Sequence, residues 1–138
     1  MDKPAKPDLR VTSVTIGTSM PRELARFYAR LLDWPITAME EPRPDEPEQA
    51  GWAQIRPPEG VAGPTLNFEF ERCFQRPVWP AEKGEQTATQ HLDIHVDDLE
   101  SAVAWAVSCG AVVAGFQPQE TVRVMRDPDG HPFCLFLS

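Results

Sequence analysis

Residues 91–96 alternate strictly between polar and apolar side chains. Successive side chains of a strand point to opposite faces, so this alternation predicts a strand with one buried face and one polar face. The polar face would present His91, Asp93 and His95. Asp97 and Asp98 follow as good helix N-cap residues and Gly110 ends the helical spacing, so a helix is expected between them.

The start of the chain shows the same order of patterns. Residues 10–18 alternate and predict a strand. Ser19 is expected to cap a helix that holds Pro21 in its first turn, where the missing N–H costs nothing. One face of this helix carries apolar residues at helical spacing, namely Leu24, Phe27, Tyr28 and Leu31.

The two strand-helix units match each other at an offset of 78 residues. At this offset the corresponding pairs are Val14 and Leu92, Ile16 and Ile94, Met20 and Asp98, and Phe27 and Trp105. Identity between the units is low, but the pattern of faces is shared. Internal repetition of this kind implies two copies of one supersecondary unit that bury a face together.

Six further segments have the short length and residue content of strands. They are residues 35–39, 51–56, 65–71, 111–116, 121–126 and 132–137. The predicted order is therefore β-α-β-β-β, a linker, and β-α-β-β-β again, which is an α+β fold. We expect one domain over residues 1–138, with a first module at about 9–72, a linker at about 73–88 and a second module at about 89–138.

Two connecting segments have distinctive chemistry. Residues 40–48, EEPRPDEPE, are acidic and rich in proline, and they predict a solvated loop, with a functional lid as the alternative. Residues 127–130, DPDG, predict a tight turn because proline presets φ and glycine relaxes the last position. His131 follows this turn and is expected to be exposed.

Composition narrows the classes of protein. The net charge of −8 argues against nucleic acid as a partner, because phosphates require a basic face. No run of apolar residues is long enough to cross a membrane, and the first ten residues lack the apolar core of a secretory signal. Three widely spaced cysteines indicate reduced thiols in the cytoplasm rather than a disulfide framework.

Three stretches together give the chain a family resemblance: VTSVTIGTSMPRELARFYARLLDWP, QHLDIHVDDLESAVAWAVSCGA and MRDPDGHPFCLFL. It resembles the vicinal oxygen chelate superfamily, which includes glyoxalase I, extradiol dioxygenases and bleomycin-resistance proteins. The resemblance implies two βαβββ modules, each a curved half-barrel of mixed sheet with its helix on the outer face. The concave polar faces would line a cavity for a small molecule, and a homodimer is expected because relatives commonly form one.

The resemblance also implies where metal ligands would lie, at the first and last strands of each module. Ser13 stands where metal-using relatives have histidine, whereas His91 keeps the histidine. Cys134 stands where relatives have glutamate, and the remaining position falls among Thr65, Asn67 and Glu69.

Two departures from the metal pattern lead us to favour no cofactor, although a divalent metal stays open. If an ion is bound, its ligands are expected to be His91, Glu69 and Cys134, because such a site needs three converging ligands. A buried cysteine that serves only as a small hydrophobe is the alternative for Cys134. We expect purified protein to carry less than one transition-metal ion per chain.

His91 and Glu69 are the candidate catalytic residues. An imidazole titrates near neutral pH, so His91 suits a general base or a hydrogen-bond donor, and the alternative is a wall residue without chemistry. Asp93 lies two positions away on the same face, where it would either orient a histidine or lie in water. Glu69 is expected to be a cavity acid because Phe68 and Phe70 occupy the core face of the strand, and an exposed strand residue is the alternative.

Aromatic residues suggest a binding role. Trp52 and Phe136 occur in predicted strands where they could face a cavity, and Trp79 in the linker could close its mouth. Packing in the core is the alternative for all three, and it is the expectation for Trp34 and Trp105. The expected ligand-binding set is Ser13, Trp52, Asn67, Glu69, His91, Asp93, Cys134 and Phe136.

Three classes of function remain open on this basis. The first is a lyase-, isomerase- or dioxygenase-like enzyme that uses His91, with or without a metal. The second is a non-catalytic protein that binds or sequesters a drug or metabolite, with Glu69 and the acidic loop attracting a cation. The third is an interaction domain whose cavities are filled by its own side chains.

Overall fold

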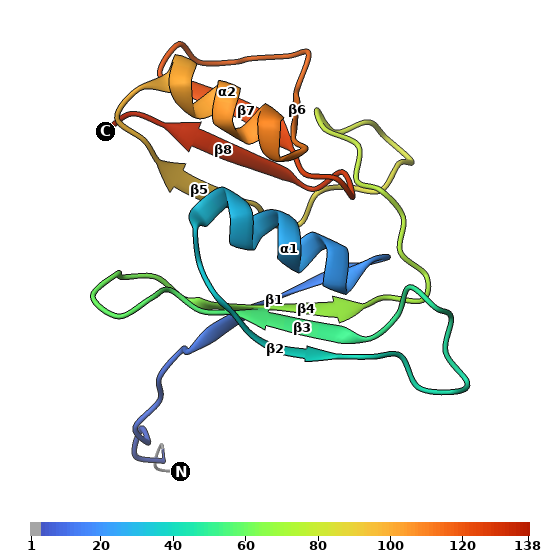
Figure 1. Ribbon diagram of the computed structural model, residues 1–138. Helices are drawn as coiled ribbons and strands as arrows, with labels where there is room; N and C mark the ends of the chain where they lie inside the picture. Colours follow the sequence, from blue (N-terminus) through green and yellow to red (C-terminus); the bar gives the residue numbers. More distant parts are fainter. Residues whose placement is uncertain (1–3) are drawn as a thin grey trace.

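The computed structural model describes residues 4–138, so Met1, Asp2 and Lys3 of the N-terminal segment lie outside the described residues. It contains two helices and two four-stranded sheets (Figure 1). The elements are β1 (Ser13–Thr18), α1 (Pro21–Leu32), β2 (Ile36–Glu40), β3 (Trp52–Ile55), β4 (Thr65–Phe70), β5 (Leu92–His95), α2 (Leu99–Cys109), β6 (Val112–Val113), β7 (Val122–Arg126) and β8 (Pro132–Phe136). Every strand and helix predicted from the pattern is present, with ends shifted by a few residues.

The two sheets have the same topology. Their strand orders are β1-β4-β3-β2 and β5-β8-β7-β6. In each sheet the first and last strands pair in parallel, β1 with β4 and β5 with β8, and the other neighbours are antiparallel. α1 begins at Pro21 and α2 at Leu99, which is the offset of 78 found in the sequence. The predicted α+β fold of two βαβββ units with unclosed mixed sheets is confirmed.

One hydrophobic core joins the two units. α1 lies between the β1–β4 sheet and the β5–β8 sheet, as Figure 1 shows. The Tyr28 ring of α1 stacks on Phe68 of β4 at 5.8 Å and meets the edge of Phe133 of β8 at 6.0 Å between ring centroids. Each sheet therefore turns its apolar face toward the helices and its polar face away from them. Within residues 4–138, the two polar faces therefore point away from each other.

The start of α1 differs from the prediction. Met20, rather than Ser19, is the N-cap residue, and its side chain makes no capping bond. The Ser19 hydroxyl instead donates to Asp129 Oδ1 at 2.9 Å, and the Ser19 amide donates to Asp129 Oδ2 at 2.8 Å. Ser19 therefore donates to a carboxylate of the second module instead of capping the helix, because hydrogen bonds to a charged acceptor are the stronger ones. The Asp98 cap of α2 is as predicted, accepting from the Ser101 amide at 3.0 Å.

The burial predictions for Trp105 and His131 were wrong. Trp105 is 51 % exposed instead of lying in the core. Its indole N–H donates to the carbonyl oxygen of Leu31 at 3.0 Å, which satisfies one of the carbonyls left unpaired at the end of α1. His131 was expected in solvent, but its side chain is only 18 % exposed because it lies against the buried Asp127.

Candidate functional site

The uncovered face of the first sheet carries a row of polar side chains. Gln54 donates to Asn67 Oδ1 at 2.9 Å, and Asn67 donates to Thr15 Oγ1 at 3.5 Å, so the side chains of three neighbouring strands are linked. Trp52 and Glu69 are direct cross-strand partners on β3 and β4, at the end of this row. Two of the residues expected to bind a ligand are therefore neighbours in space.

Trp52 and Glu69 lie in a cleft of about 420 Å³ between the sheet and the loop after β2. Its lining residues are Glu40, Glu41, Arg43, Glu46, Gly51, Trp52, Glu69 and Phe70. Four glutamates face one arginine in this cleft, so its charge is negative. Trp52 is half-buried and adds an aromatic wall. We call this site the acidic cleft.

Arg22 of α1 holds the loop that forms one wall of the acidic cleft. Its guanidinium donates to the carbonyl oxygens of Glu48 and Ala50 and pairs with Glu41 at 2.9 Å. The loop then turns at Gly51, where φ is +101° and a Cβ would collide with the carbonyl oxygen of Glu40. Only glycine fits this close approach without strain. The expected acidic loop is thus fixed to the helix at several points.

The uncovered face of the second sheet gathers a different group of side chains. His91 Nε2 lies 3.1 Å from Asp93 Oδ1, and Asp93 is the cross-strand partner of Cys134 on β8. One ligand atom from each of these three residues lies within 4.8 Å of the other two. His91 and Asp93 are 48 % and 60 % exposed, so the group is open to solvent. Burial, with the charge and hydrogen bond of Asp93 added, raises the pKa of the Cys134 thiol.

These three side chains fit a metal ion by the chemistry of their donors. Imidazole, carboxylate and thiolate together suit Zn²⁺, and three protein ligands leave a fourth position open. Glu69 is not part of the group; among the described residues, Asp93 takes the third place that we expected Glu69 to fill. Ser13 lies on the other sheet, paired with Thr65.

The other predicted site residues are placed as follows. Glu69 is exposed on its strand, which is the alternative to a buried cavity acid. Phe136 packs its ring against His95 at 5.5 Å between ring centroids, next to Cys134 on the uncovered face. Trp79 packs on Phe116 at 5.9 Å, away from the acidic cleft. All three cysteines are free thiols, as expected.

The sequence pattern did not predict a buried polar network at the edge between the two units. Asp127 and Asp129 are 1 % and 5 % exposed, although both belong to a turn. Their partners include Thr18, Tyr28 and His131. One signal in the sequence could have indicated this network. Two carboxylates in one tight turn are followed directly by a histidine, and a turn exposed to solvent does not need that combination.

Comparison with known proteins agrees with this architecture. A family model described as a glyoxalase-like domain matches residues 13–136. The search of curated proteins found no match to the chain. No helix within residues 4–138 has the length and apolar character needed to cross a membrane.

Solved structures with this fold share little sequence with the chain. A glyoxalase family protein from Enterococcus faecalis is 18 % identical with a TM-score of 0.64, and the match covers 92 % of this chain and 96 % of that one. TnmS3, an antibiotic-binding protein from Streptomyces sp. CB03234, is 18 % identical with a TM-score of 0.59 and coverage of 96 % and 98 %. The fosfomycin resistance protein FosX from Listeria monocytogenes, in complex with Mn(II) and 1S,2S-dihydroxypropylphosphonic acid, is 10 % identical with a TM-score of 0.66 and coverage of 92 % and 90 %. At these identities the likeness concerns the fold alone.

Proposed function

The chain belongs to the glyoxalase-like domain family of the vicinal oxygen chelate superfamily, and from that premise we propose that it binds a cationic, aromatic small molecule in the acidic cleft. The observation that carries this proposal is the pairing of Trp52 with Glu69 beside three further glutamates. In this role the protein sequesters its ligand and does not transform it.

The chemistry of the acidic cleft supports a cation over an anion. A positive charge over the face of Trp52 is attracted by the electrons of the ring, and glutamates nearby add Coulombic attraction. Flat ligands suit a cleft bounded by the Trp52 indole on a sheet and by a loop on the other side. A volume of about 420 Å³ is within the range of small-molecule sites. TnmS3, which has the same fold, is described as antibiotic-binding.

Binding of two dyes of opposite charge tests the proposal. We expect the flat aromatic cation proflavine to bind measurably and the flat aromatic anion fluorescein not to bind, as measured by fluorescence anisotropy. Trp52→Ala should weaken proflavine binding about fivefold, because it removes the aromatic wall. Glu69→Gln should weaken it about threefold, and added salt should weaken it further.

Two matched variants control for general effects on folding. Trp79→Ala removes a half-buried tryptophan away from the acidic cleft, and Glu59→Gln removes an exposed glutamate from another loop. Both should bind proflavine like the unchanged protein. Equal binding of the two dyes, or unchanged affinity in Trp52→Ala, would show that the acidic cleft is not a cation site.

The assembly state is a second part of the proposal. We propose a homodimer in which another copy covers the uncovered face of the second sheet, because Phe136 on that face is only half-buried in a single chain. Light scattering coupled to size-exclusion chromatography should then give twice the 15.5 kDa of one chain. A monomer at micromolar concentration would contradict this arrangement.

Metal-dependent chemistry at the second sheet is an alternative function, supported by the convergence of His91, Asp93 and Cys134. A bound Zn²⁺ there would supply Lewis acidity and a more acidic bound water. His91 and Asp93 would hold the ion, and Cys134 would have to lose its thiol proton first. Because the pKa of Cys134 is raised, zinc affinity should increase as pH rises from 6 to 9.

Zinc titration separates the two functions. If this alternative holds, His91→Ala should abolish stoichiometric zinc binding in a competition assay with a fluorescent chelator, whereas His95→Ala, a change on the same face, should leave it intact. Once a substrate is known, an enzyme should lose turnover in His91→Ala far more than affinity. Proflavine binding should be the same in both variants, since the acidic cleft lies on the other sheet.

A further inference from the structure

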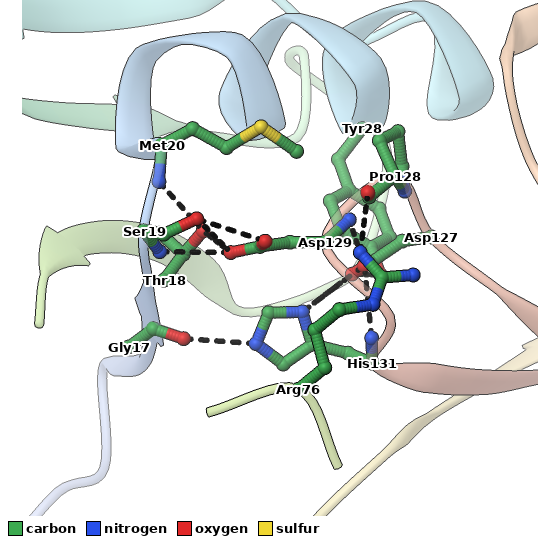
Figure 2. A network of polar contacts seen from close by, with 10 residues as sticks. All are labelled: Gly17, Thr18, Ser19, Met20, Tyr28, Arg76, Asp127, Pro128, Asp129 and His131. Carbon is green, nitrogen blue, oxygen red and sulfur yellow. Dashed lines mark hydrogen bonds and ion pairs between the residues drawn. The ribbon is translucent and has the colours of Figure 1, made fainter. Parts of the chain in front are cut away.

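The turn between β7 and β8 contacts the junction of β1 and α1 through a chain of buried polar groups (Figure 2). Asp129 Oδ2 accepts a hydrogen bond from Thr18 Oγ1 at 2.5 Å and one from the Ser19 amide at 2.8 Å. These partners are more than 100 positions apart in the sequence and belong to different modules. The turn is therefore a direct connection between the two halves of the protein.

His131 makes the second part of this connection. Its Nδ1 lies 2.9 Å from Asp127 Oδ2, and its Nε2 lies 2.8 Å from the carbonyl oxygen of Gly17 on β1. Figure 2 shows the ring placed between these two oxygens. A carboxylate and a carbonyl oxygen both accept hydrogen bonds, so both ring nitrogens must donate. Only the protonated imidazolium carries a proton on each nitrogen.

Neutral histidine cannot keep both contacts. It has one N–H, and its other ring nitrogen would then face an oxygen lone pair at about the same distance. Asp127 is the stronger acceptor because it is charged, and it is buried with further donors from Tyr28 and the Asp129 amide. The contact that is lost on deprotonation is therefore the one to Gly17, which is one of several hydrogen bonds between the modules.

Other ionisable groups lie near the His131 ring, in the turn and in the walls of the neighbouring cavities. The guanidinium of Arg76, from the linker, donates to the carbonyl oxygen of Pro128 at 3.2 Å and lies over Gly130. Asp127 and Asp129 oppose this positive charge from within the turn. The ionisable groups nearby are Tyr28, Glu71, Cys73, Arg76, His91, Asp127 and Asp129.

His131 also forms part of the wall of two neighbouring cavities at this edge. One, of about 320 Å³, lies between β1 and the linker and includes Gly17 and Phe74. The other, of about 190 Å³, is mainly apolar and includes Val14 and Tyr28. Both also include Ile16, Gln90 and Pro132. Neither belongs to the acidic cleft, so changes here can be measured without a ligand of that cleft.

We propose that protonated His131 closes the edge between the two modules, and that loss of its proton to solvent frees the Gly17 carbonyl and opens the cavity between β1 and the linker. The Gly17–His131 hydrogen bond is thus a pH-dependent contact. It acts on the relative position of the modules, whereas the hydrogen bonds inside each sheet are unaffected.

The direction of the pKa agrees with this geometry. Burial favours the neutral ring, but the hydrogen bond and charge of Asp127, the Gly17 carbonyl and the charge of Asp129 outweigh it and raise the pKa of His131. A raised folded-state pKa means that the stabilisation is complete below the unfolded value of about 6.5. It is lost as pH rises through the higher folded value.

Nuclear magnetic resonance of the unchanged protein provides the test. We expect the ring nitrogens of His131 to report an imidazolium at pH 6 and to titrate above pH 6.5. Over that titration the exchange protection of the Ser19 amide should fall about tenfold after correction for the intrinsic rate, because the junction opens locally. Amides of the central strand β4 should keep their protection.

Two variants complete the experiment. His131→Gln can donate to Asp127 or to Gly17 but carries no charge, so its Ser19 protection at pH 6 should be about tenfold lower and independent of pH. His95→Gln alters an exposed histidine and should behave like the unchanged protein. The proposal is overturned if the His131 ring is neutral at pH 6. It is equally overturned if Ser19 protection stays constant through the titration, or if it falls together with that of β4.

Discussion

The hydroxyl of Tyr28 donates to Asp127 Oδ2 at 2.8 Å, and this hydrogen bond joins α1 of the first module to the β7–β8 turn of the second. Both side chains are almost completely buried. The Tyr28 ring also packs between Phe68 and Phe133, so a single residue links the polar network to the core. Buried hydrogen bonds to a charged acceptor are among the stronger ones in proteins, so this residue should matter for stability.

Replacing Tyr28 by phenylalanine keeps the ring and removes the donor. We expect Tyr28→Phe to lower the free energy of unfolding by about 1.5 kcal/mol, because buried Asp127 loses one of its partners. Urea denaturation followed by circular dichroism measures this value. Phe27→Leu would lower stability through packing alone, so only Tyr28→Phe should also change the titration of His131. An unchanged midpoint for Tyr28→Phe would mean that the bond contributes nothing net.

Absorbance at alkaline pH provides a second test of the burial of Tyr28. Burial, followed by the charge and hydrogen bond of Asp127, raises the pKa of Tyr28 well above its usual value near 10. The unfolded chain ionises its tyrosine near pH 10 while the folded chain does not, so stability should fall as pH rises above 10. Because Tyr28 is the only tyrosine, the tyrosinate band should appear only together with unfolding. Tyrosinate in a still folded protein at pH 10 would contradict the burial of this hydroxyl.

Trp105 provides a test of the contact between the helices. Its indole N–H donates to Leu31 at the end of α1, and half of the side chain is exposed. Trp105→Phe should lower the free energy of unfolding by about 1 kcal/mol because the carbonyl loses its donor. Val107→Ala, at another exposed position of α2, should have a smaller effect. Chemical denaturation of both variants decides whether the indole contributes through its hydrogen bond.

Arg22 should control the order of the acidic loop. Arg22→Ala removes the donors to Glu48 and Ala50 and the ion pair with Glu41. Hydrogen exchange of residues 41–50 should become about tenfold faster or more, because several hydrogen bonds are lost together. Arg26→Ala, one turn along the same helix, is the control, since the hydrogen bond of Arg26 goes to the sulfur of Met39 and not to the loop. If the loop wall matters for binding, Arg22→Ala should also weaken proflavine affinity. Unchanged hydrogen exchange of residues 41–50 in Arg22→Ala would show that the loop is ordered without Arg22.

The order of elements followed from the sequence because it depends on local periodicity. Alternation at period 2 marked β1 and β5, helical spacing marked α1 and α2, and the shared offset of 78 marked the repeat. Helix caps that depend only on neighbouring residues were also predicted: α2 has Asp98 as its N-cap and Gly110 as its C-cap, as expected. The family resemblance added the two-module architecture, which the sheets confirm.

Long-range contacts were decided only by the tertiary structure. A polar group in a turn is normally satisfied by water, so nothing near Asp129 or His131 in the sequence indicates their partners Ser19 and Gly17. Trp105 has the helical position of a core residue, but its exposure depends on how α2 lies on α1. Likewise, the sequence determined which residues share a face of a sheet. The tertiary structure decided where those faces point, because α1 lies between the sheets and both polar faces therefore turn outward. Two separate sites result, one with Trp52 and Glu69 and the other with His91 and Asp93.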